Sequence, residues 1–381
     1  MKVLTVTPSF PRFEGDYHGR FIYDLCRKLF ENGVDLKVLA PRTKSSKPFP
    51  TGFEVDRFPF IPRQRWESLS ERTMKGAPLA HLIQLPPYMA SAYLHLMAES
   101  ASVVHAHLAI PMGFLATLLP GRTPLVVTCH GSDCTLPCTD PIFRPFVRHT
   151  LTRADRVVAV SDFVGRIAVQ LGAPPEKVET IPMGIDTSKF KPSRDAAPLR
   201  EEFGIPEGCA VIGTLGRLVS EKRVEDIIRV VPHVFRKVDA VFLIGGDGPR
   251  RAYLEELAGR RENIRFLGEV RDAPLFHRLC DVFVMASVRE GLSVALQEAM
   301  ATGCVPVAVN GFGYPELVDE GVNGYLFELG DAQGMAYKIL KAIDSRELGK
   351  KARETIQKSF ELEDNAMRYL RLYDDLIRSN C

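Results

Sequence analysis

Apolar, strand-like runs alternate with amphipathic helical stretches from one end of the chain to the other. In the first half, the runs that predict strands are KVLTVT, VDLKVLA, VVHAH, PLVVTC, RVVAVS and VETIP. Between the first two lies GRFIYDLCRKLFENG, a predicted helix that ends at Gly33 and has Phe21, Leu25, Leu29 and Phe30 on its apolar face. Strands and helices that alternate in this way indicate parallel α/β sheets.

A second series of strand-like runs begins near residue 209. It comprises CAVIGTLG, AVFLIGG, IRFLGEV, DVFVMAS, CVPVAVN and GYLFE. The segment VEDIIRVVPHVFRK has helical spacing, with an apolar face of Val224, Ile227, Ile228, Val231, Val234 and Phe235. The second half therefore repeats the α/β pattern of the first.

The two series are separated by DTSKFKPSRDAAPLREEFG, which is polar, contains two prolines and lacks a strand pattern. We place a linker near residues 186–200 and predict an α/β fold of two doubly wound, Rossmann-like domains that face each other across a cleft. The predicted domains are 1–190 and 191–358. Residues 359–381 are predicted to form a helix that packs back on the first domain through Met367, Leu370, Tyr373, Leu376 and Ile377.

Composition agrees with a globular chain of two cores. The sequence has 381 residues, of which 45% are hydrophobic and 25% charged, and this length exceeds one ordinary core. The formal net charge of +2 gives no overall field that favours nucleic acid, so we expect no nucleic-acid partner. The first apolar run is short and is interrupted by Pro8, and no run approaches the roughly 20 apolar residues that cross a bilayer. We therefore expect neither secretion nor a membrane span.

The chain has eight cysteines, too few for a disulfide scaffold, and we expect reduced thiols. Cys129, Cys134 and Cys138 cluster in CHGSDCTLPC, but their spacing matches no common zinc pattern. Small buried thiols are the preferred interpretation, and we predict no bound metal and no cofactor.

Chemically informative residues follow the predicted strands of the second half, where open α/β sheets bind ligands. Arg217 and Lys222 lie in GRLVSEK, between a strand and a helix. Two cations beside helix amides suit a diphosphate, although a solvated loop pair has the same appearance. The glycines of LIGGDGP permit close approach to a ligand or a plain turn. Their spacing is not G-x-G-x-x-G, which disfavours a nicotinamide cofactor.

Two glutamates stand eight positions apart in SVREGLSVALQEAM, at Glu290 and Glu298. If a helix begins near Gly291, they are separated by roughly 12 Å along its axis at about 1.5 Å per residue. A carboxylate at each end, with helix amides between, suits an elongated ligand with hydroxyls at both ends and phosphates in the middle. A nucleotide sugar has this layout. The alternative is an exposed helix residue and an acidic residue favoured by the helix dipole.

Taken together, the motifs GRLVSEK, GGDGP, REGLSVALQEAMATGCVPVAV and DEGVNGYLF resemble those of the GT-B glycosyltransferases, specifically the retaining family four. VHAHLAIPMG, TCHGSD, VSDFVGRIAV and IPMGID resemble that family's acceptor-domain landmarks, so the resemblance spans nearly the whole chain.

The resemblance implies a role for each matching residue. Glu298 would bind the donor ribose and Glu290 the donor sugar, while Arg217 and Lys222 would hold the diphosphate and stabilise the leaving group. His130 would approach the transferred sugar from the first domain. The implied catalytic residues are His130, Glu290, Arg217 and Lys222. The implied donor-binding residues are Gly15, Gly216, Arg217, Lys222, Gly246, Glu290, Gly291, Leu292, Ser293 and Glu298.

Acceptor-binding expectations fall on the first domain. The family often has a glycine pair after its first strand, whereas this chain has Gly15 followed by Asp16 and a later Gly19. Gly15 is the best donor contact there, and Asp16 and His107 are the acceptor-binding candidates. A histidine after a strand can also be purely structural, and His107 can serve only to orient its neighbours.

For mechanism, the resemblance implies a metal-independent transfer of a hexose-type sugar from a nucleotide diphosphate sugar to a hydroxyl, with retention at the anomeric carbon. The acceptor would be a glycolipid, a polysaccharide precursor or a small molecule. Alternatives are a sugar phosphorylase, a nucleotide-sugar epimerase, or a non-catalytic protein that binds sugar nucleotides. The base, the sugar, the linkage and the oligomeric state are not determined by the sequence.

Basic and aromatic residues interleave in residues 42–75, where Phe58, Phe60, Ile61, Trp66 and Leu69 lie among arginines and lysines. This mixture fits a surface that rests on anionic lipid and receives a lipid-linked acceptor. It equally fits a variable acceptor loop that folds over its own domain. We expect a cytoplasmic protein and leave open peripheral contact with the cytoplasmic face of a membrane.

Overall fold

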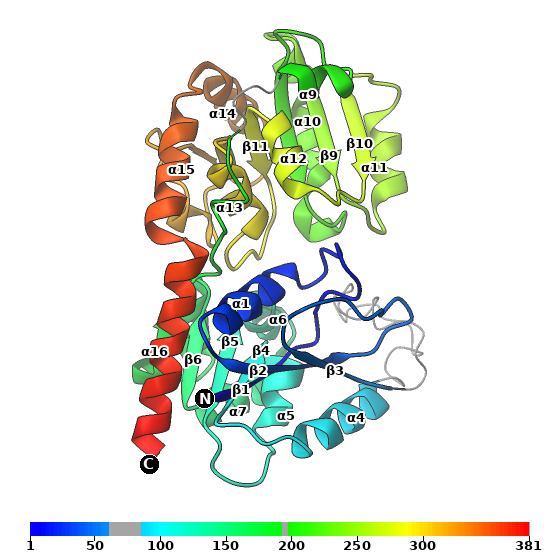
Figure 1. The fold of residues 1–381 in the computed structure, drawn as a ribbon. Helices are drawn as coiled ribbons and strands as arrows, with labels where there is room; N and C mark the ends of the chain where they lie inside the picture. Colours follow the sequence, from blue (N-terminus) through cyan, green and yellow to red (C-terminus); the bar gives the residue numbers. More distant parts are fainter. Residues whose placement is uncertain (61–84, 193–196, 381) are drawn as a thin grey trace. The chain divides into compact units, whose positions relative to one another are not determined.

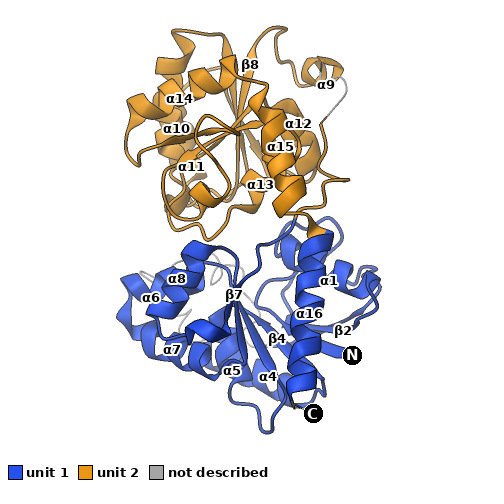
Figure 2. Ribbon diagram, turned by 90° about the vertical axis from the view of Figure 1, so that its left-hand side faces the viewer, with its two compact units in different colours: residues 1–184, 363–381 blue, residues 185–362 orange. Residues whose placement is uncertain are grey.

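The computed structural model describes residues 1–60, 85–192 and 197–380 (Figure 1), and the chain forms two compact units. Unit 1 comprises residues 1–184 and 363–381, and unit 2 comprises residues 185–362 (Figure 2). Both are built on a parallel sheet of the Rossmann type, so the predicted α/β fold of two doubly wound halves is confirmed. Residues 193–196 of the predicted linker lie outside the described residues.

Unit 1 has a seven-stranded sheet in the order β3-β2-β1-β4-β5-β6-β7, and every pairing is parallel. Its strands are β1 (Lys2–Val6), β2 (Asp35–Pro41), β3 (Glu54–Phe58), β4 (Val103–His107), β5 (Leu125–Cys129), β6 (Arg156–Ala159) and β7 (Val178–Thr180). Its helices are α1 (Arg20–Glu31), α4 (Leu85–Met97), η1 (Ala109–Gly113), α5 (Phe114–Ala116), α6 (Ser132–Thr139), η2 (Pro141–Phe143), α7 (Arg144–Arg153), α8 (Asp162–Gln170), η3 (Pro175–Lys177) and α16 (Leu362–Asn380).

Unit 2 has a six-stranded parallel sheet in the order β10-β9-β8-β11-β12-β13. Its strands are β8 (Ala210–Leu215), β9 (Ala240–Gly245), β10 (Ile264–Gly268), β11 (Val282–Met285), β12 (Val305–Val309) and β13 (Tyr325–Phe327). Its helices are α9 (Ala197–Glu202), η4 (Ser220–Lys222), α10 (Val224–Phe235), α11 (Arg251–Ala258), α12 (Ala273–Leu279), α13 (Val294–Ala301), η5 (Tyr314–Glu316), α14 (Ala332–Asp344) and α15 (Leu348–Ser359).

The order of strands reverses once in each sheet, between β1 and β4 in unit 1 and between β8 and β11 in unit 2. At such a switch point the connections leave in opposite directions, and a crevice opens at the carboxyl ends of the two central strands. Strands buried on both faces must be apolar throughout, which is why nearly all of them were visible as apolar runs.

The edge strand β3 is a correction to the sequence prediction. Residues 54–60 belong to the stretch interpreted as a membrane-facing or variable loop, but Phe58 has no exposed surface and Phe60 is 2% exposed. Both rings pack edge-on against Tyr88 of α4, at centroid distances of 5.2 and 5.3 Å. These two residues belong to the core of unit 1. Ile61, Trp66 and Leu69 lie outside the described residues.

The predicted helices are present, and their buried faces include most of the predicted residues but not all of them. In α1 the buried residues are Ile22, Leu25, Cys26 and Leu29, whereas Phe30 is 39% exposed. Phe235 of α10 and Met367 of α16 are also exposed. The buried face of α16 includes Ala366, Tyr369, Leu372, Tyr373 and Leu376. The sequence prediction missed the small Ala366 and also Tyr369, whose hydroxyl lies 3.3 Å from the Thr128 hydroxyl.

The C-terminal helix α16 belongs to unit 1 (Figure 2), and polar side-chain contacts join it to β4, to the segment after β7 and to α1. Tyr373 Oη lies 2.7 Å from His105 Nδ1 in β4, and Asn365 donates to the Pro182 carbonyl at 2.9 Å. Lys28 of α1 forms an ion pair with Glu363 at 3.1 Å. No helix in the described part of the chain is both long enough and apolar enough to cross a membrane.

The burial of Phe58 predicts a stability effect. We expect Phe58→Ala to lower the free energy of unfolding by about 3–5 kcal/mol, because it leaves a cavity beneath Tyr88. Leu94→Ala in α4, whose side chain is 65% exposed, should change it by less than about 0.5 kcal/mol. Urea denaturation of both variants measures the difference, and equal effects would contradict the core position of Phe58.

Candidate active site

In unit 2, the loops after β8 and β9 approach each other so closely that only glycine fits. Gly246 has φ +116°, and a Cβ built on it would lie 1.9 Å from the Gly216 carbonyl oxygen. A Cβ on Gly248 would lie 2.5 Å from the Leu218 carbonyl oxygen. Hydrogen bonds from Gly216 N to Gly245 O and from Leu218 N to Asp247 O hold this contact at 3.1 and 2.9 Å. The crossing fixes the start of the loop that carries Arg217 and Lys222.

Lys222 and Glu290 form a direct ion pair at the carboxyl edge of the unit 2 sheet. Lys222 ends the short helix η4 after β8, and Glu290 lies in the loop after β11. A backbone hydrogen bond of 2.8 Å from Val288 N to Glu221 O joins the two loops next to the pair. The side chains keep 26% and 20% of their surface, so both are accessible to a ligand. Arg217 is half-buried in the same loop.

The helix predicted to begin near Gly291 begins at Val294, and this is a correction. Ser293 is its N-cap, and the Ser293 hydroxyl accepts from Leu296 N at 3.3 Å. Glu290, Gly291 and Leu292 therefore precede α13. The segment is held by a 3.3 Å bond from Gly313 N to the Glu290 carbonyl and by contact between Gly313 and Gly291, where a Cβ on Gly313 would meet the Gly291 oxygen at 1.9 Å. A capping serine and a packed glycine stop the helix from starting earlier.

Glu298 lies in the second turn of α13, and its partner was not anticipated from the sequence. Glu298 Oε2 is 3.4 Å from Nε2 of His277, a residue of α12 with no exposed surface. The His277 ring packs against Phe283 at a centroid distance of 5.0 Å. Glu298 keeps 18% of its side-chain surface. In the sequence His277 lies in FHRLC, a short segment with no motif. Nothing in it indicated that His277 would meet a carboxylate 21 positions away.

Tyr314 is a second residue that the sequence did not reveal. It lies in η5, fully buried, beside the loop that holds Glu290. Burial raises the pKa of Tyr314 well above its ordinary value, and the nearby Glu290 carboxylate raises it further. The Tyr314 phenol beside Glu290, Ser287 and Ser293 is therefore neutral. It can offer a hydrogen bond to the site but adds no charge to it.

In unit 1, three histidine rings lie next to one another: His105 and His107 belong to β4, and His130 follows β5. The ring centroids of His105 and His107 are 4.3 Å apart, and those of His107 and His130 are 5.2 Å apart. His107 Nδ1 lies 2.9 Å from His130 Nε2. His105 and His107 have no exposed surface, whereas His130 retains some. Other groups cover His105 and His107 in this conformation, and both roles weighed for His107, acceptor binding and orientation of its neighbours, stay predictions.

The histidine row is anchored by hydroxyls and by a carboxylate. His105 Nε2 lies 2.7 Å from the Thr128 hydroxyl and its Nδ1 lies 2.7 Å from Tyr373 Oη. The Asp133 carboxylate accepts from the backbone N–H groups of Ala109, His130 and Gly131 at 2.8, 3.1 and 3.0 Å, which fixes the loop that begins with His130. Burial lowers the pKa of His130 to about 4, so a neutral imidazole is presented at neutral pH.

Asp133 also belongs to a compact buried group with Cys129 and Cys134, whose ligand atoms lie within 4.8 Å of one another. The Asp133 oxygens are already used by three backbone N–H groups. Burial raises the pKa of Asp133, and the pKa of the Cys134 thiol is raised as well. Neutral thiols and a carboxylate that is already hydrogen-bonded are typical of a packed core. That this group binds no metal stays a prediction.

The loop after β1 holds Gly15 and Asp16. Gly15 has φ +82° with open space around its Cα, whereas a Cβ on Gly19 would lie 2.5 Å from the Ser9 carbonyl oxygen. Close backbone approach therefore occurs at Gly19. The Asp16 side chain is fully buried and accepts from Arg12 Nε at 2.6 Å and from Arg12 N at 2.8 Å. Burial acts to raise its pKa, but the hydrogen bonds from Arg12 and His18 outweigh burial and lower it. Asp16 thus shapes its own loop in this conformation.

Two parallel Rossmann-type sheets, with polar and charged groups at the strand ends, are the architecture of the GT-B fold. Two family models match the chain: one described as glycosyl transferases group 1 over residues 195–359, and one described as glycosyltransferase family 4 over residues 18–189. The chain belongs to the group 1 glycosyltransferases, and the resemblance drawn from the sequence motifs is confirmed.

Named relatives cover most of the chain. N-acetyl-alpha-D-glucosaminyl L-malate synthase of Bacillus anthracis is 29% identical over 314 residues, which are 78% of this chain and 82% of the relative. GDP-mannose-dependent alpha-(1-6)-phosphatidylinositol monomannoside mannosyltransferase of Mycobacterium tuberculosis is 29% identical over 350 residues, 86% and 85% of the two chains. The enzyme class predicted from the sequence, glycosyltransferase, is thereby confirmed.

Solved structures share the fold. Anabaena HepE, solved in complex with UDP, superposes with a TM-score of 0.80 at 21% identity and covers 98% of this chain and 100% of its own. Sucrose-phosphate synthase from Thermosynechococcus elongatus superposes with a TM-score of 0.84 at 17% identity, with both chains fully covered. At these identities the likeness establishes the GT-B fold.

The crossing at Gly246 predicts a strong effect of one added methyl group. Gly246→Ala places a Cβ inside the Gly216 carbonyl, so the loops must separate, and we expect a loss of about 2–4 kcal/mol in unfolding free energy together with displacement of Lys222. Gly259→Ala is the matched control, because Gly259 also has a positive φ but its Cβ would meet nothing. Urea denaturation of both variants tests this, and a smaller effect at Gly246 than at Gly259 would contradict it.

The buried histidines predict that the stability of unit 1 falls in mild acid. Burial, helped by the neighbouring His130, lowers the pKa of His105 to about 3, whereas an unfolded histidine titrates near 6.5. Between these values the unfolded chain binds more protons, so unfolding free energy decreases as pH falls from about 6.5, by about 1.4 kcal/mol per pH unit for each such group. His105→Gln should flatten the dependence of unfolding free energy on pH between about 6.5 and 4.5 by about one proton. Urea denaturation at several pH values in this range measures the slope, and an unchanged slope would contradict the prediction.

Proposed function

We propose that this glycosyltransferase moves a hexose-type sugar from a nucleotide diphosphate sugar to a hydroxyl group, with retention at the anomeric carbon and without a metal ion. The observation that carries the proposal is the Lys222–Glu290 pair at the carboxyl edge of the unit 2 sheet, with Arg217 in the same loop and Glu298 in the next helix. A fold neighbour supports the donor class, since HepE was solved with UDP and with UDP-glucose.

The proposed donor site is divided by charge. Arg217 and Lys222 attract the diphosphate and stabilise the negative charge that grows on it as the glycosidic bond breaks. Glu298, paired with the buried His277, accepts from the ribose hydroxyls, and Glu290 accepts from hydroxyls of the sugar. The backbone of Gly291, Leu292 and Ser293 completes the site. Fixed cations supply the compensating charge that a divalent ion supplies in other transferases, and this is the physical basis for proposing metal independence.

The proposed reaction is a same-face substitution. The bond between the anomeric carbon and the diphosphate oxygen breaks, the acceptor oxygen bonds to the same face of that carbon, and the acceptor proton passes to the departing phosphate oxygen. His130 is proposed to hydrogen-bond a hydroxyl of the transferred sugar as a neutral imidazole, since its pKa is about 4. His107 holds it in place through the 2.9 Å contact.

Unit 1 is proposed to bind the acceptor, a carbohydrate or lipid-linked hydroxyl compound. The two named relatives act on L-malate and on a phosphatidylinositol mannoside, acceptors that each combine a hydroxyl with an anionic group. The seven described cysteines are free thiols, which supports a cytoplasmic location. Peripheral contact with a membrane remains part of the proposal. Phe58 and Phe60 take no part in it, because both are buried.

Activity assays with a panel of UDP-, GDP- and ADP-sugars test the proposal. We expect one donor to release nucleoside diphosphate in the presence of excess EDTA, and NMR of the product to show the donor's anomeric configuration. Glu298→Ala should raise KM for the donor about tenfold or more, because a charged hydrogen-bond acceptor is lost. Lys222→Met should lower kcat about 10²- to 10³-fold. Glu256→Ala, an exposed carboxylate of α11, is the control.

Several outcomes would contradict the proposal. An inverted product rules out retention, and loss of turnover in EDTA rules out metal independence. A sugar phosphate that is a better donor than every nucleotide sugar favours a phosphorylase, and conversion of the nucleotide sugar without release of the diphosphate favours an epimerase. Tight nucleotide binding with no turnover favours a non-catalytic binding protein.

A further inference from the structure

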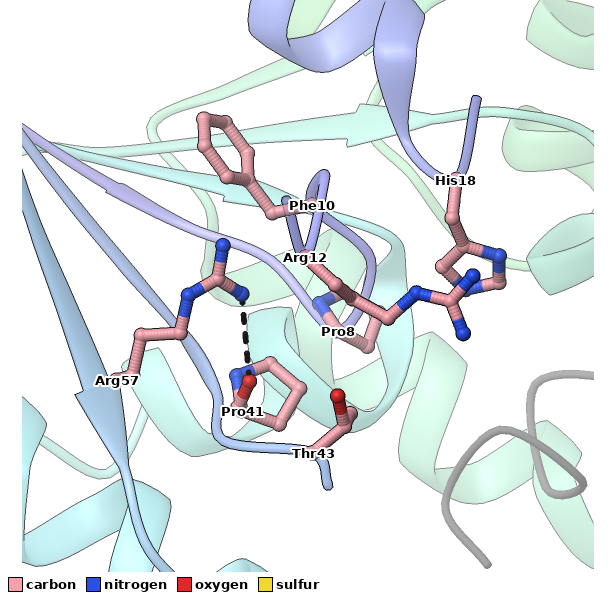
Figure 3. Close-up of a pocket in the computed structure, with 7 residues that line it drawn as sticks. All are labelled: Pro8, Phe10, Arg12, His18, Pro41, Thr43 and Arg57. Atoms are coloured by element: carbon pink, nitrogen blue, oxygen red, sulfur yellow. Dashed lines mark hydrogen bonds between the residues drawn. The ribbon is translucent and has the colours of Figure 1, made fainter. Parts of the chain in front are cut away.

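A pocket lies in unit 1 between the loop after β1, the end of β2 with the loop that follows it, and strand β3 (Figure 3). It is lined by Pro8, Phe10, Arg12, His18, Pro41, Thr43 and Arg57. Two of these side chains carry guanidinium groups: Arg12 comes from the loop after β1 and Arg57 from β3, and Figure 3 shows Pro8, Pro41 and Thr43 beside them. None of the catalytic expectations from the sequence falls on this pocket.

Arg57 is held at the pocket by neutral groups. It is half-buried in β3, and its N–H groups donate to the carbonyl of Pro41 at 3.4 Å and to the carbonyl of Pro11. Its guanidinium carbon lies 5.8 Å from the centre of the Phe10 ring. Within the described ranges, no carboxylate forms an ion pair with Arg57. Burial lowers the pKa of Arg57 to about 10, so a cation is present at neutral pH without a partner of its own.

The Asp16 carboxylate is engaged by Arg12 and forms no hydrogen bond with Arg57. Asp16 receives two side-chain hydrogen bonds from Arg12, at 2.6 and 3.1 Å, and two further bonds from the backbone N–H groups of Arg12 and His18. Asp16 attracts the Arg57 guanidinium through space, and Arg12 repels it. Among the described residues, Arg57 therefore has hydrogen bonds to neutral carbonyls and no ion pair. A cation that is partly removed from water ordinarily has an anionic partner, which is the reason to look for an anion from outside the chain.

The loops around the pocket are joined through their backbones, so the cations are held in position before any ligand arrives. Lys47 N donates to the Arg12 carbonyl at 2.6 Å, and Arg42 N donates to the Phe58 carbonyl at 2.9 Å. Arg42, Lys44 and Lys47 are exposed on the loop after β2 and extend the positive character outward. Donors that are already ordered lose little freedom on binding.

We infer that this pocket binds the anionic group, a carboxylate or a phosphate, of the hydroxyl-bearing acceptor, with Arg57 as its main ligand and Arg12 beside it. A planar guanidinium matches both groups through paired N–H donors. The inference rests on the proposed function, because it names the chemistry of the acceptor. The donor diphosphate is not the preferred occupant, since its own cations, Arg217 and Lys222, are provided by unit 2.

Binding to the full chain tests the assignment, with L-malate and inorganic phosphate as soluble probes in calorimetry at constant ionic strength. Vesicles of phosphatidylinositol in phosphatidylcholine, against phosphatidylcholine alone, are the lipid probe in flotation. The variants are Arg57→Gln, which removes the charge, and Arg57→Lys, which keeps the charge but loses the paired donors. Arg156→Gln is the control, because Arg156 is also a half-buried strand arginine that donates to a backbone carbonyl, at 3.0 Å, but lies outside the pocket.

We expect at least one of the three probes to bind wild type, Arg57→Gln to weaken it about tenfold or more, Arg57→Lys to weaken it less, and Arg156→Gln to leave it unchanged. Malate or phosphate binding identifies a small acceptor, whereas vesicle binding alone identifies a lipid phosphate. No binding of any probe, or equal binding by wild type and Arg57→Gln, overturns the inference. If Arg57→Gln does not fold, Arg57→Lys decides by the same comparison.

The donor assay separates this inference from the proposed function. Release of nucleoside diphosphate from the nucleotide sugar in the absence of acceptor depends on unit 2, and we expect Arg57→Gln to retain it. Retained release with unchanged anion binding refutes the anion pocket alone. Absence of any donor turnover by wild type refutes the proposed function, whatever the pocket binds.

Discussion

The pairing of β8 with β11 is the constraint on which the candidate donor site depends. These strands are adjacent in the sheet, with Val282 opposite Ile212, although about 70 positions separate them in the sequence. Because both strands run in the same direction, the loops that follow them leave the sheet at the same edge. The loops that carry Lys222 and Glu290 therefore come together. The bond from Val288 N to Glu221 O and the glycine crossing at Gly246 then reduce the freedom of these loops to one arrangement.

In unit 1, adjacent parallel strands also bring side chains together, but these side chains are neutral. Its strand ends deliver three histidines whose charged forms are disfavoured by burial, and α16 returns from the far end of the chain to place the Tyr373 hydroxyl on His105. The C-terminal helix therefore does more than cover apolar surface. Its hydroxyl satisfies one ring nitrogen of the innermost histidine, which would otherwise be a buried polar atom without a partner. Rings fixed in this way give His130 a defined orientation at the strand end.

The sequence was sufficient for the features that repeat along it. Twelve apolar runs were proposed as strands, and each contains one in the structure. The edge strand β3 was missed because EVDRF has only two apolar residues, and an edge strand needs only one covered face. The start of α13 was misplaced by three residues, because Gly291 fits a helix entrance but Ser293 forms the cap.

Contacts between distant segments were beyond the reach of the sequence. His277 meets Glu298, and Tyr314 lies beside Glu290, only because the sheet order brings α12, α13 and η5 together. The pocket around Arg57 has the same origin, since it joins three segments that are separated in the sequence. Residue type and spacing identified the reactive side chains. The neighbours that pair with those side chains are set by the order of strands in the sheet and could not be identified from the sequence.

The Lys222–Glu290 pair illustrates why the partner matters. Both groups are partly solvated, and an ion pair of this kind contributes only about 0–1 kcal/mol. Breaking it is therefore inexpensive, and a diphosphate with its greater negative charge can compete with Glu290 for Lys222. Release of Glu290 then leaves a carboxylate in a loop fixed by Gly313, where it can accept hydrogen bonds from a sugar. In the proposed donor site, this weak pair holds Lys222 and Glu290 in position until the nucleotide sugar binds.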